Sequence, residues 1–227
     1  MKKHSKRYRE NIKKVDPAKV YSPKEAIGIL AGLKAPKFDE TVELSCVLGV
    51  DFKKSDQVVR GTAVMPHGTG KKITLLALVE EKDAAEAKSA GADLIGLAEY
   101  IPKIAGGWTD FDVAITTPNC LKEVARLGKV LGPRGLMPSP KNGTVTTTIS
   151  QTIKELKAGR VEFRMEKAGI LHLPVGKRSF PAESLLDNLK AALTAISASS
   201  PAVFKGQFIK RLYLTTTMGV SLPITPE

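Results

Sequence analysis

Hydrophobic and polar residues alternate in the outer parts of the chain, whereas the middle part carries longer apolar runs. In residues 41–50 every second side chain is apolar, which is the period of a strand with one buried face. Residues 58–65 have the same character over a shorter length. The alternation returns in residues 161–165 and 171–175, on either side of the turn residues 167–169. This pattern predicts half-exposed strands, the last two of which would form a hairpin.

The middle of the chain follows another rule. Residues 73–79 are almost continuously apolar, as expected of a strand that is buried on both faces of a parallel sheet. Helix-like and strand-like segments then alternate as far as a helix at 149–157, which ends before Gly159. This order is typical of βαβ units. The intervening elements are expected as a helix at 82–90, a strand at 93–96, a helix at 97–104, a strand at 111–117 and a helix from Leu121.

The two hydrophobicity patterns, alternating in the outer segments and continuously apolar in the middle, predict two domains. An amphipathic helix at 181–197 and a strand at 209–216 complete the outer pattern. We therefore expect an α/β protein in which residues 1–66 and 160–227 form one discontinuous, two-layer α/β domain with a mostly antiparallel sheet. Residues 67–159 would form an inserted, three-layer, Rossmann-like α/β/α domain.

Both crossings between the predicted domains contain glycine. Gly68 and Gly70 follow the first boundary, and Gly159 precedes the second. Because glycine is the most permissive residue in its backbone angles, these three positions are predicted to act as a hinge about which the domains move as bodies.

The charge of the chain indicates a polyanionic partner. Lys and Arg number 35 against 23 Asp and Glu, which gives a net charge of +12. Residues 67–159 contribute only +2 of this, so the outer segments contribute +10. Residues 1–20 hold eight basic residues and two acidic ones. This segment is either a solvated arm or an arm that contacts phosphates.

Several classes of protein are disfavoured. Cys46 and Cys120 lie far apart without a neighbouring cysteine, so neither a disulfide framework nor a zinc site is expected, and the compartment should be reducing. No apolar run approaches the roughly 18 residues of a membrane span, and no signal peptide is recognisable. The histidines His4, His67 and His172 have no spacing typical of metal ligands. We expect a cytoplasmic protein without a metal or cofactor.

Signatures of enzymes are incomplete. The segment His67–Lys72 is similar to the end of a phosphate-binding loop, but Met65 stands at the position of its first glycine. Lys72 replaces the hydroxyl residue that would hold magnesium, and Ile73 replaces the third glycine of a dinucleotide fingerprint. No nucleophile elbow is present, and no catalytic residue can be named. A nucleotide-dependent enzyme that uses the inserted domain remains the alternative to an RNA-binding protein.

A basic loop interrupts the inserted domain. Residues 124–154 contain no acidic side chain, and the stretch 127–143 carries Lys129, Arg134 and Lys141 among repeated glycine and proline. Such a loop cannot be one helix or strand, and it suits an anionic polymer. It is interpreted as an auxiliary contact or a feature of domain packing.

Four separated motifs resemble one family. They are Lys37-Phe-Asp-Glu-Thr-Val-Glu43, Pro66-His-Gly-Thr-Gly-Lys71, the stretch 127–141 and Thr216-Thr-Met-Gly219. In this order, and over essentially the whole chain, they are similar to the bacterial form of the large-subunit ribosomal protein L-one family. The resemblance implies a ribosome-associated protein, monomeric when free, that binds ribosomal RNA of the mobile lateral stalk. It also implies that the protein assists release of transfer RNA from the exit site and represses its own operon's messenger RNA.

The resemblance also implies an RNA surface. The residues concerned are Lys37, Phe38, Glu40, Thr41, Thr217, Met218 and Gly219. Phe38 could pack on a sugar or base, and the threonine hydroxyls could address ribose 2′-OH groups. Glu40 could accept from a base amine or order a neighbouring basic residue. Gly219 would permit close backbone approach.

Taken singly, these residues also have structural interpretations. Phe38 could be a core aromatic, Met218 a core residue that fills a gap, and the threonines ordinary strand formers. The family usually continues after Met-Gly with Pro-Gly, whereas Val220 and Ser221 follow here. The turn after Gly219 is therefore less rigidly preset.

Overall fold

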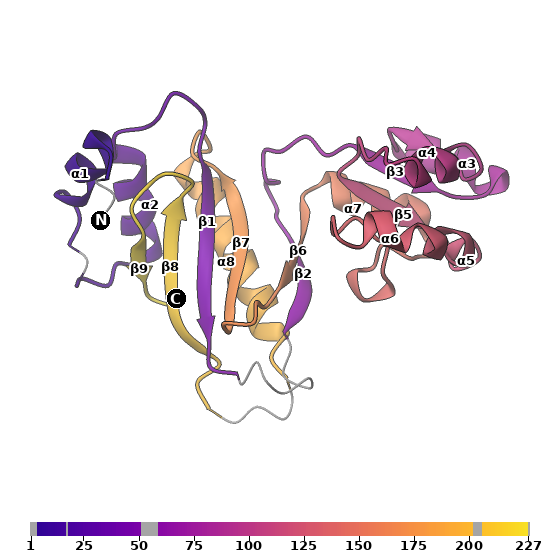
Figure 1. Ribbon diagram of the computed structural model, residues 1–227. Helices are drawn as coiled ribbons and strands as arrows, with labels where there is room; N and C mark the ends of the chain where they lie inside the picture. The colour runs from indigo at the N-terminus through magenta and orange to yellow at the C-terminus, as the bar shows by residue number, and fades with distance from the viewer. Residues whose placement is uncertain (1–3, 17, 51–58, 202–205, 227) are drawn as a thin grey trace. The chain divides into compact units, whose positions relative to one another are not determined.

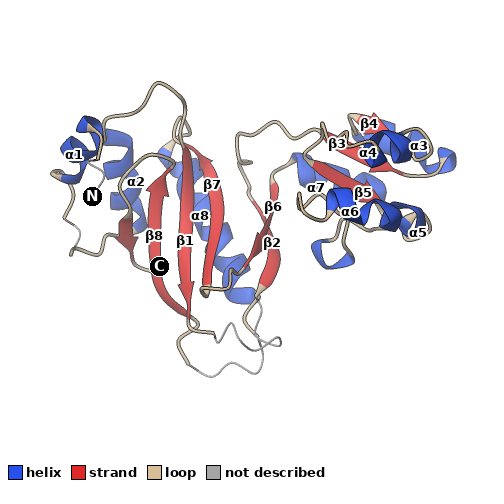
Figure 2. Ribbon diagram, in the orientation of Figure 1, coloured by secondary structure: helices blue, strands red, loops and turns tan. Residues whose placement is uncertain are grey.

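The computed structural model describes residues 4–16, 18–50, 59–201 and 206–226 (Figures 1 and 2). It has the mixed α/β fold that the sequence predicts, and it divides into two compact units. We call Met1–Gly70 with Gly159–Glu227 the outer unit and Lys71–Ala158 the inserted unit. Val58, the first residue of a predicted strand, and residues 1–3 of the basic arm lie outside the described residues.

The outer unit is built on a four-stranded antiparallel sheet of order β7-β1-β8-β9, labelled in Figure 1. Its strands are β1 (Thr41–Leu48), β7 (Ile170–Lys177), β8 (Ile209–Thr216) and β9 (Leu222–Ile224). A separate two-stranded ribbon consists of β2 (Arg60–Val64) and β6 (Arg160–Arg164). The helices are α1 (Lys6–Ile12), α2 (Pro23–Gly32) and α8 (Ala182–Ala198).

Strand β1 is central and confirms the predicted alternation. Val42, Leu44, Cys46 and Leu48 are buried, while the residues between them are half-buried. The buried side chains belong to one core with apolar residues of α2, α8 and the β2–β6 ribbon. Two helices therefore cover one face of the sheet, which gives two layers (Figure 2). Burial also raises the pKa of the Cys46 thiol to about 12, so this cysteine remains protonated.

The predicted hairpin is wrong. The turn is present, with the Glu166 amide donating to the Ile170 carbonyl, but the two strands belong to different sheets. β6 pairs with β2, and β7 pairs with β1. The alternating pattern identifies the buried face of each strand, but it carries no information about the strand's partner.

Three elements of the outer unit lie in segments for which the sequence pattern gave no expectation: α1, α2 and β9. A signal for α2 was present. The Ser22 hydroxyl accepts from the Glu25 amide, the Glu25 carboxylate accepts from the Ser22 amide, and Pro23 occupies the first turn. Serine followed three residues later by glutamate is a recognised start signal for a helix.

The inserted unit is a three-layer α/β/α arrangement. Its parallel sheet has the order β4-β3-β5. On strand β3, Leu75 and Ala77 pack toward α3 and α7, whereas Leu76 and Leu78 pack toward α4, α5 and α6. The continuous burial predicted for this strand is confirmed. The elements are β3 (Leu75–Leu78), α3 (Glu81–Ala90), β4 (Leu94–Ile95), α4 (Tyr100–Ala105), β5 (Val113–Thr116), α5 (Leu121–Val124), a 3₁₀ turn (Ala125–Leu127), α6 (Gly128–Leu131), a second 3₁₀ turn (Pro140–Asn142) and α7 (Ile149–Lys157).

The junction segments of the outer unit are held by Asn188, a fully buried residue of α8. Its amide nitrogen donates to the carbonyls of Gly68 and Val175 at 2.9 and 2.8 Å. Its oxygen accepts from the His67 amide at 3.0 Å. A Cβ at position 159 would lie 2.5 Å from the Gly68 Cα, so the two segments approach one another closely. Glycine is required here for space as well as for conformation.

No described helix is long and apolar enough to cross a bilayer.

Candidate nucleic-acid interface

Residues 37–41 and 217–219, which the family resemblance identified as candidate RNA-binding segments, meet at one end of the four-stranded sheet. β1 begins at Thr41 and β8 ends at Thr216, and the two strands are antiparallel neighbours. The Thr41 amide donates to the Thr217 hydroxyl at 3.0 Å, and the Thr217 amide donates to the Thr41 carbonyl at 3.1 Å. Residues 37–41 and 217–219 therefore form one continuous surface, which we call the rim.

Glu40 organises the rim from within. Its side chain is 1% exposed, so it does not present a carboxylate to a ligand. One oxygen accepts from the Met218 amide at 3.0 Å and lies 3.8 Å from Arg7 Nη1. The other oxygen accepts from Arg178 Nη1 at 2.8 Å. Of the two roles considered for Glu40, the ordering of neighbouring basic residues is the one that this geometry supports.

Arg178 and helix α1 connect this carboxylate to the rest of the outer unit. The Arg178 guanidinium also donates to the carbonyls of Ala31, at 3.1 Å, and Leu33, at the end of α2. Helix α1 is fixed to the loop that follows α2. The Asn11 side chain exchanges two hydrogen bonds with the backbone of Lys34 in that loop. A planar guanidinium with five donors suits such a junction better than a lysine would.

The apolar residues of the rim are exposed. The side chains of Phe38 and Met218 are 52% and 55% accessible, so neither is a core residue. Lys37 is exposed beside them. Arg7 donates to the Met218 carbonyl at 3.1 Å, so both main-chain polar groups of Met218 are fixed while its side chain remains free. Exposed apolar side chains on an ordered backbone are typical of a binding surface.

The hydroxyls of Thr41 and Thr217 make hydrogen bonds within the protein. The Thr217 hydroxyl accepts from the Thr41 amide and lies 3.3 Å from the Thr41 carbonyl. The Thr41 hydroxyl accepts from Lys177 Nζ at 3.0 Å. Since a hydroxyl has two acceptor positions, each can still accept from an external donor. The Ser179 hydroxyl donates to Asp39 at 2.7 Å and fixes the adjacent loop.

Glycine at position 219 is required by the structure of the chain itself. Its amide donates to the Thr216 carbonyl at 2.9 Å and closes a tight turn. A Cβ at this position would overlap the Thr216 hydroxyl oxygen. The close approach thus occurs within the chain itself, whatever else the glycine contacts.

The auxiliary basic loop belongs to the inserted unit. Lys129 and Arg134 are exposed, and the side chain of Lys141 lies outside the described residues. As predicted, the loop is neither one helix nor one strand. It contains the short helix α6 and a 3₁₀ turn, and the Ser139 amide donates to the Thr144 hydroxyl at 2.8 Å.

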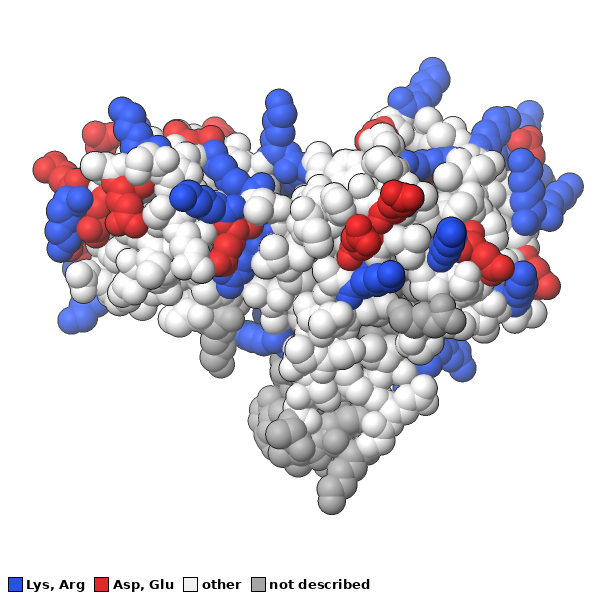
Figure 3. Space-filling view, turned by 180° about the vertical axis from the view of Figure 1, so that it is seen from behind, with Lys and Arg blue, Asp and Glu red and all other residues white. Residues whose placement is uncertain are grey.

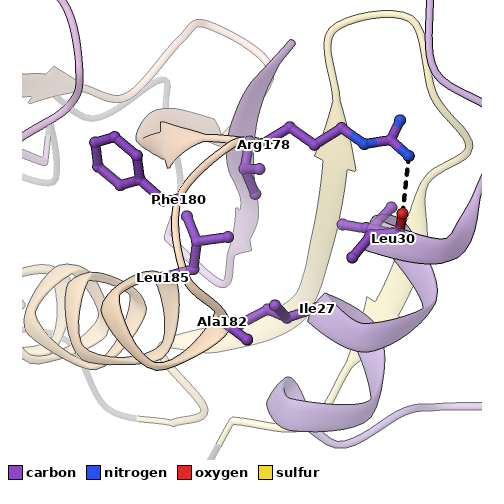
Figure 4. Close-up of a pocket in the computed structure, with 8 residues that line it drawn as sticks. Ile27, Leu30, Arg178, Phe180, Ala182 and Leu185 are labelled. Atoms are coloured by element: carbon purple, nitrogen blue, oxygen red, sulfur yellow. Dashed lines mark hydrogen bonds between the residues drawn. The ribbon is translucent and has the colours of Figure 1, made fainter. Parts of the chain in front are cut away.

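A cavity of about 40 Å³ lies between α2, α8 and the end of β7. Ile27, Leu30, Phe180 and Leu185 line it, and the Arg178 guanidinium extends away from it toward the backbone of α2 (Figure 4). This volume holds about one water molecule, so the cavity is no cofactor site. Among the described residues no group of His, Cys, Asp and Glu is arranged to hold a metal ion.

Sequence reasoning missed Arg7, Lys177 and Arg178 as residues that contact the rim. Arg7 belongs to a basic segment in which nothing distinguished it from its neighbours. Lys177 ends strand β7 and Arg178 follows it, and the pairing of this strand with β1 was not predicted. Only the pairing of β1 with β7 brings these residues to the rim.

Comparison with known proteins places the chain in one family. The family model described as the Ribosomal protein L1p/L10e family matches residues 29–220. The chain is 50% identical over 228 positions to the large ribosomal subunit protein uL1 of Thermus thermophilus, and the match covers all of both chains. It is also 50% identical to the protein of that name from Kosmotoga olearia, over 99% of this chain and 97% of the relative. The chain therefore belongs to the Ribosomal protein L1p/L10e family, a family of structural proteins of the large ribosomal subunit rather than of enzymes.

Proposed function

We propose that the chain binds large-subunit ribosomal RNA, at the mobile lateral stalk, through the rim. The observation that carries this proposal is the exposure of Phe38 and Met218 on a backbone that the buried Glu40 holds in place. RNA is recognised through unstacked bases, riboses and 2′-OH groups rather than through a readable major groove. A preorganised surface with two apolar side chains and two hydroxyls matches those features.

Charge supports the proposal but does not locate the site. On the face seen in Figure 3, Lys and Arg side chains are spread over the surface rather than gathered in one patch. Phosphate contacts supply affinity without sequence information, whereas contacts to bases and riboses supply discrimination. We assign the first role to exposed cations such as Lys6, Lys13 and Lys37, and the second to Phe38, Thr217 and Met218.

Repression of the operon's messenger RNA would use the same rim. Its segments have a single fixed arrangement, so a messenger that binds there must present the same local shape as the stalk RNA. Messenger and stalk RNA would then exclude one another.

Contact with exit-site transfer RNA would use another face. On the β2–β6 ribbon, Arg60 lies directly opposite Arg164, and Val64 lies opposite Arg160. Like charges at opposed positions destabilise a pair of strands, and an anionic partner would relieve this repulsion. We assign this ribbon to transfer RNA.

We further propose that Gly68, Gly70 and Gly159 act as a hinge. All three have positive φ, at 68°, 73° and 108°. Asn188 would keep residues 67 and 68 attached to the outer unit, since its side chain binds the backbone of His67 and Gly68. Movement would then occur beyond Gly68, toward the inserted unit.

The rim and the basic arm should respond differently to substitution. Thr217→Val removes the hydroxyl that bridges to Thr41, and we expect it to cost about 1–3 kcal/mol in binding stalk RNA but little for a scrambled duplex. Met218→Asp should cost more, because it places a carboxylate against phosphates. The measurement is a salt titration of each variant with both RNAs.

Lys6→Gln with Lys13→Gln is the matched control for this experiment. Loss of these exposed charges should weaken both RNAs alike and reduce the salt dependence. The assignment fails if Thr217→Val weakens both RNAs equally while the lysine variant alone loses discrimination.

Competition should separate the two RNA faces. An operon messenger fragment should displace labelled stalk RNA from the protein, whereas transfer RNA should not. Arg60→Gln with Arg164→Gln should weaken transfer RNA alone. If transfer RNA displaces stalk RNA as well as the messenger does, the proposal of separate faces is wrong.

Distance measurements test the hinge. Spin labels at one exposed site in each unit should give a broad distance distribution, or one that shifts when stalk RNA binds. A narrow distribution that is identical in the free and bound protein would rule out the hinge.

A further inference from the structure

The four-stranded sheet of the outer unit has one face that no described element covers. Its buried side chains, including Leu44, Leu173 and Leu214, all point toward α2 and α8. The alternate side chains belong to the opposite face and remain at least partly exposed. Antiparallel sheets can leave one face to water, so exposure alone assigns no role. A role for this face must therefore be argued from the side chains on it.

Strand register arranges these side chains in rows across the sheet. The central row runs from His172 on β7 through Ser45 on β1 and Tyr213 on β8 to Pro223 on β9. On one side of it lies the row Pro174, Glu43 and Thr215, and on the other the row Ile170, Val47 and Arg211. The central row therefore has an aromatic ring in its middle and hydrogen-bonding groups beside it.

The polar groups of this row are ordered. Ser45 Oγ lies 3.0 Å from His172 Nδ1, which fixes the imidazole across β1 and β7. The other ring nitrogen, Nε2, and the Tyr213 hydroxyl have no hydrogen-bond partner in the part of the chain that the structure describes. A tyrosine ring with a free hydroxyl, next to a fixed imidazole, can stack on a base and bind its edge or its ribose.

The open face continues directly from the rim. Thr217 follows Thr215 by two residues, and Thr41 precedes Glu43 by two, so the rim threonines and this face lie on the same side of the strands. Arg211 and Lys177 contribute positive charge along this side, and Glu43 is the acidic residue among the paired positions that the structure describes there. An RNA strand that leaves the rim along the sheet would therefore meet Tyr213 after two rows, a distance of about 13 Å.

We propose that the open face is a second part of the RNA interface, on which Tyr213 stacks an unpaired base of the RNA bound at the rim. His172, held by Ser45, contacts the same nucleotide, and Arg211 contacts a phosphate beyond it. This proposal rests on the proposed function of the rim. It extends the interface from the end of the sheet onto its face and commits that face to single-stranded RNA.

Two substitutions at one position separate stacking from structure. Tyr213→Phe keeps the ring, so it should bind stalk RNA within about threefold of the native protein. Tyr213→Leu keeps apolar bulk without a ring, and it should weaken binding of stalk RNA about 5- to 150-fold, the range for loss of one base–aromatic stack. Binding of a scrambled duplex should be the same for all three proteins.

A fluorescent reporter tests the contact directly. The chain has a single tryptophan, Trp108, in the inserted unit. In Tyr213→Trp, emission in excess of the native signal comes from the sheet face, and saturating stalk RNA should quench it by stacking. The scrambled duplex should leave this emission unchanged. If the leucine variant does not fold, quenching of the Tyr213→Trp emission by stalk RNA tests the stacking proposal by itself.

The outcomes distinguish the open face from the rim. If Thr217→Val loses stalk RNA while Tyr213→Leu binds as the native protein does and the reporter is not quenched, the open face is not RNA-bound and the rim proposal stands. If neither Thr217→Val nor Tyr213→Leu changes binding, the rim proposal fails together with this one. Quenching with loss of affinity in the leucine variant supports the inference.

Discussion

A carboxylate that is removed from water must have its oxygens occupied, and this requirement at Glu40 determines the geometry of the rim. Its two oxygens bind the Met218 amide and the Arg178 guanidinium, with Arg7 nearby. These groups come from the start of the chain, the end of β7 and the segment after β8. Loss of any of these partners would leave a buried charge incompletely compensated, which is costly. The charge therefore favours one arrangement of three distant segments.

That arrangement separates the groups that hold the rim from the groups that face outward. Main-chain atoms of Thr41, Thr217 and Met218 are bound within the protein. The side chains of Phe38 and Met218 remain exposed. A surface that is ordered before binding loses little conformational entropy when a ligand arrives. Under the proposed function, this order would let a few neutral residues discriminate among RNAs on a protein whose net charge is positive.

Much of the fold could be predicted because buried side chains recur at regular intervals along each strand and helix. Alternation located β1 and β7, and the continuous apolar run located β3. The pattern did not predict which strands pair. A tight turn connects β6 and β7, as in a hairpin, but the two strands belong to different sheets. Helix α2 was missed although its capping residues, Ser22 and Glu25, are visible in the sequence.

The candidate site was predictable only in part, for the same reason. The rim residues followed from a resemblance, not from local pattern, and their spatial meeting depends on the pairing of β1 with β8. Arg7 and Arg178 could not be singled out, because their role depends on a buried carboxylate contributed by another segment. The sequence does not indicate that Glu40 is buried, and only the structure shows it.

The most direct test of Glu40 as the organiser is amide hydrogen exchange at Met218 in the RNA-free protein. Glu40→Leu removes both acceptor atoms, so the Met218 amide and Arg178 both lose their partner. We predict markedly faster exchange at Met218 in this variant, and native exchange in Glu43→Leu, whose side chain lies on the open face. Unchanged protection of Met218 in Glu40→Leu would contradict the account, because the rim would then keep its shape without the buried charge.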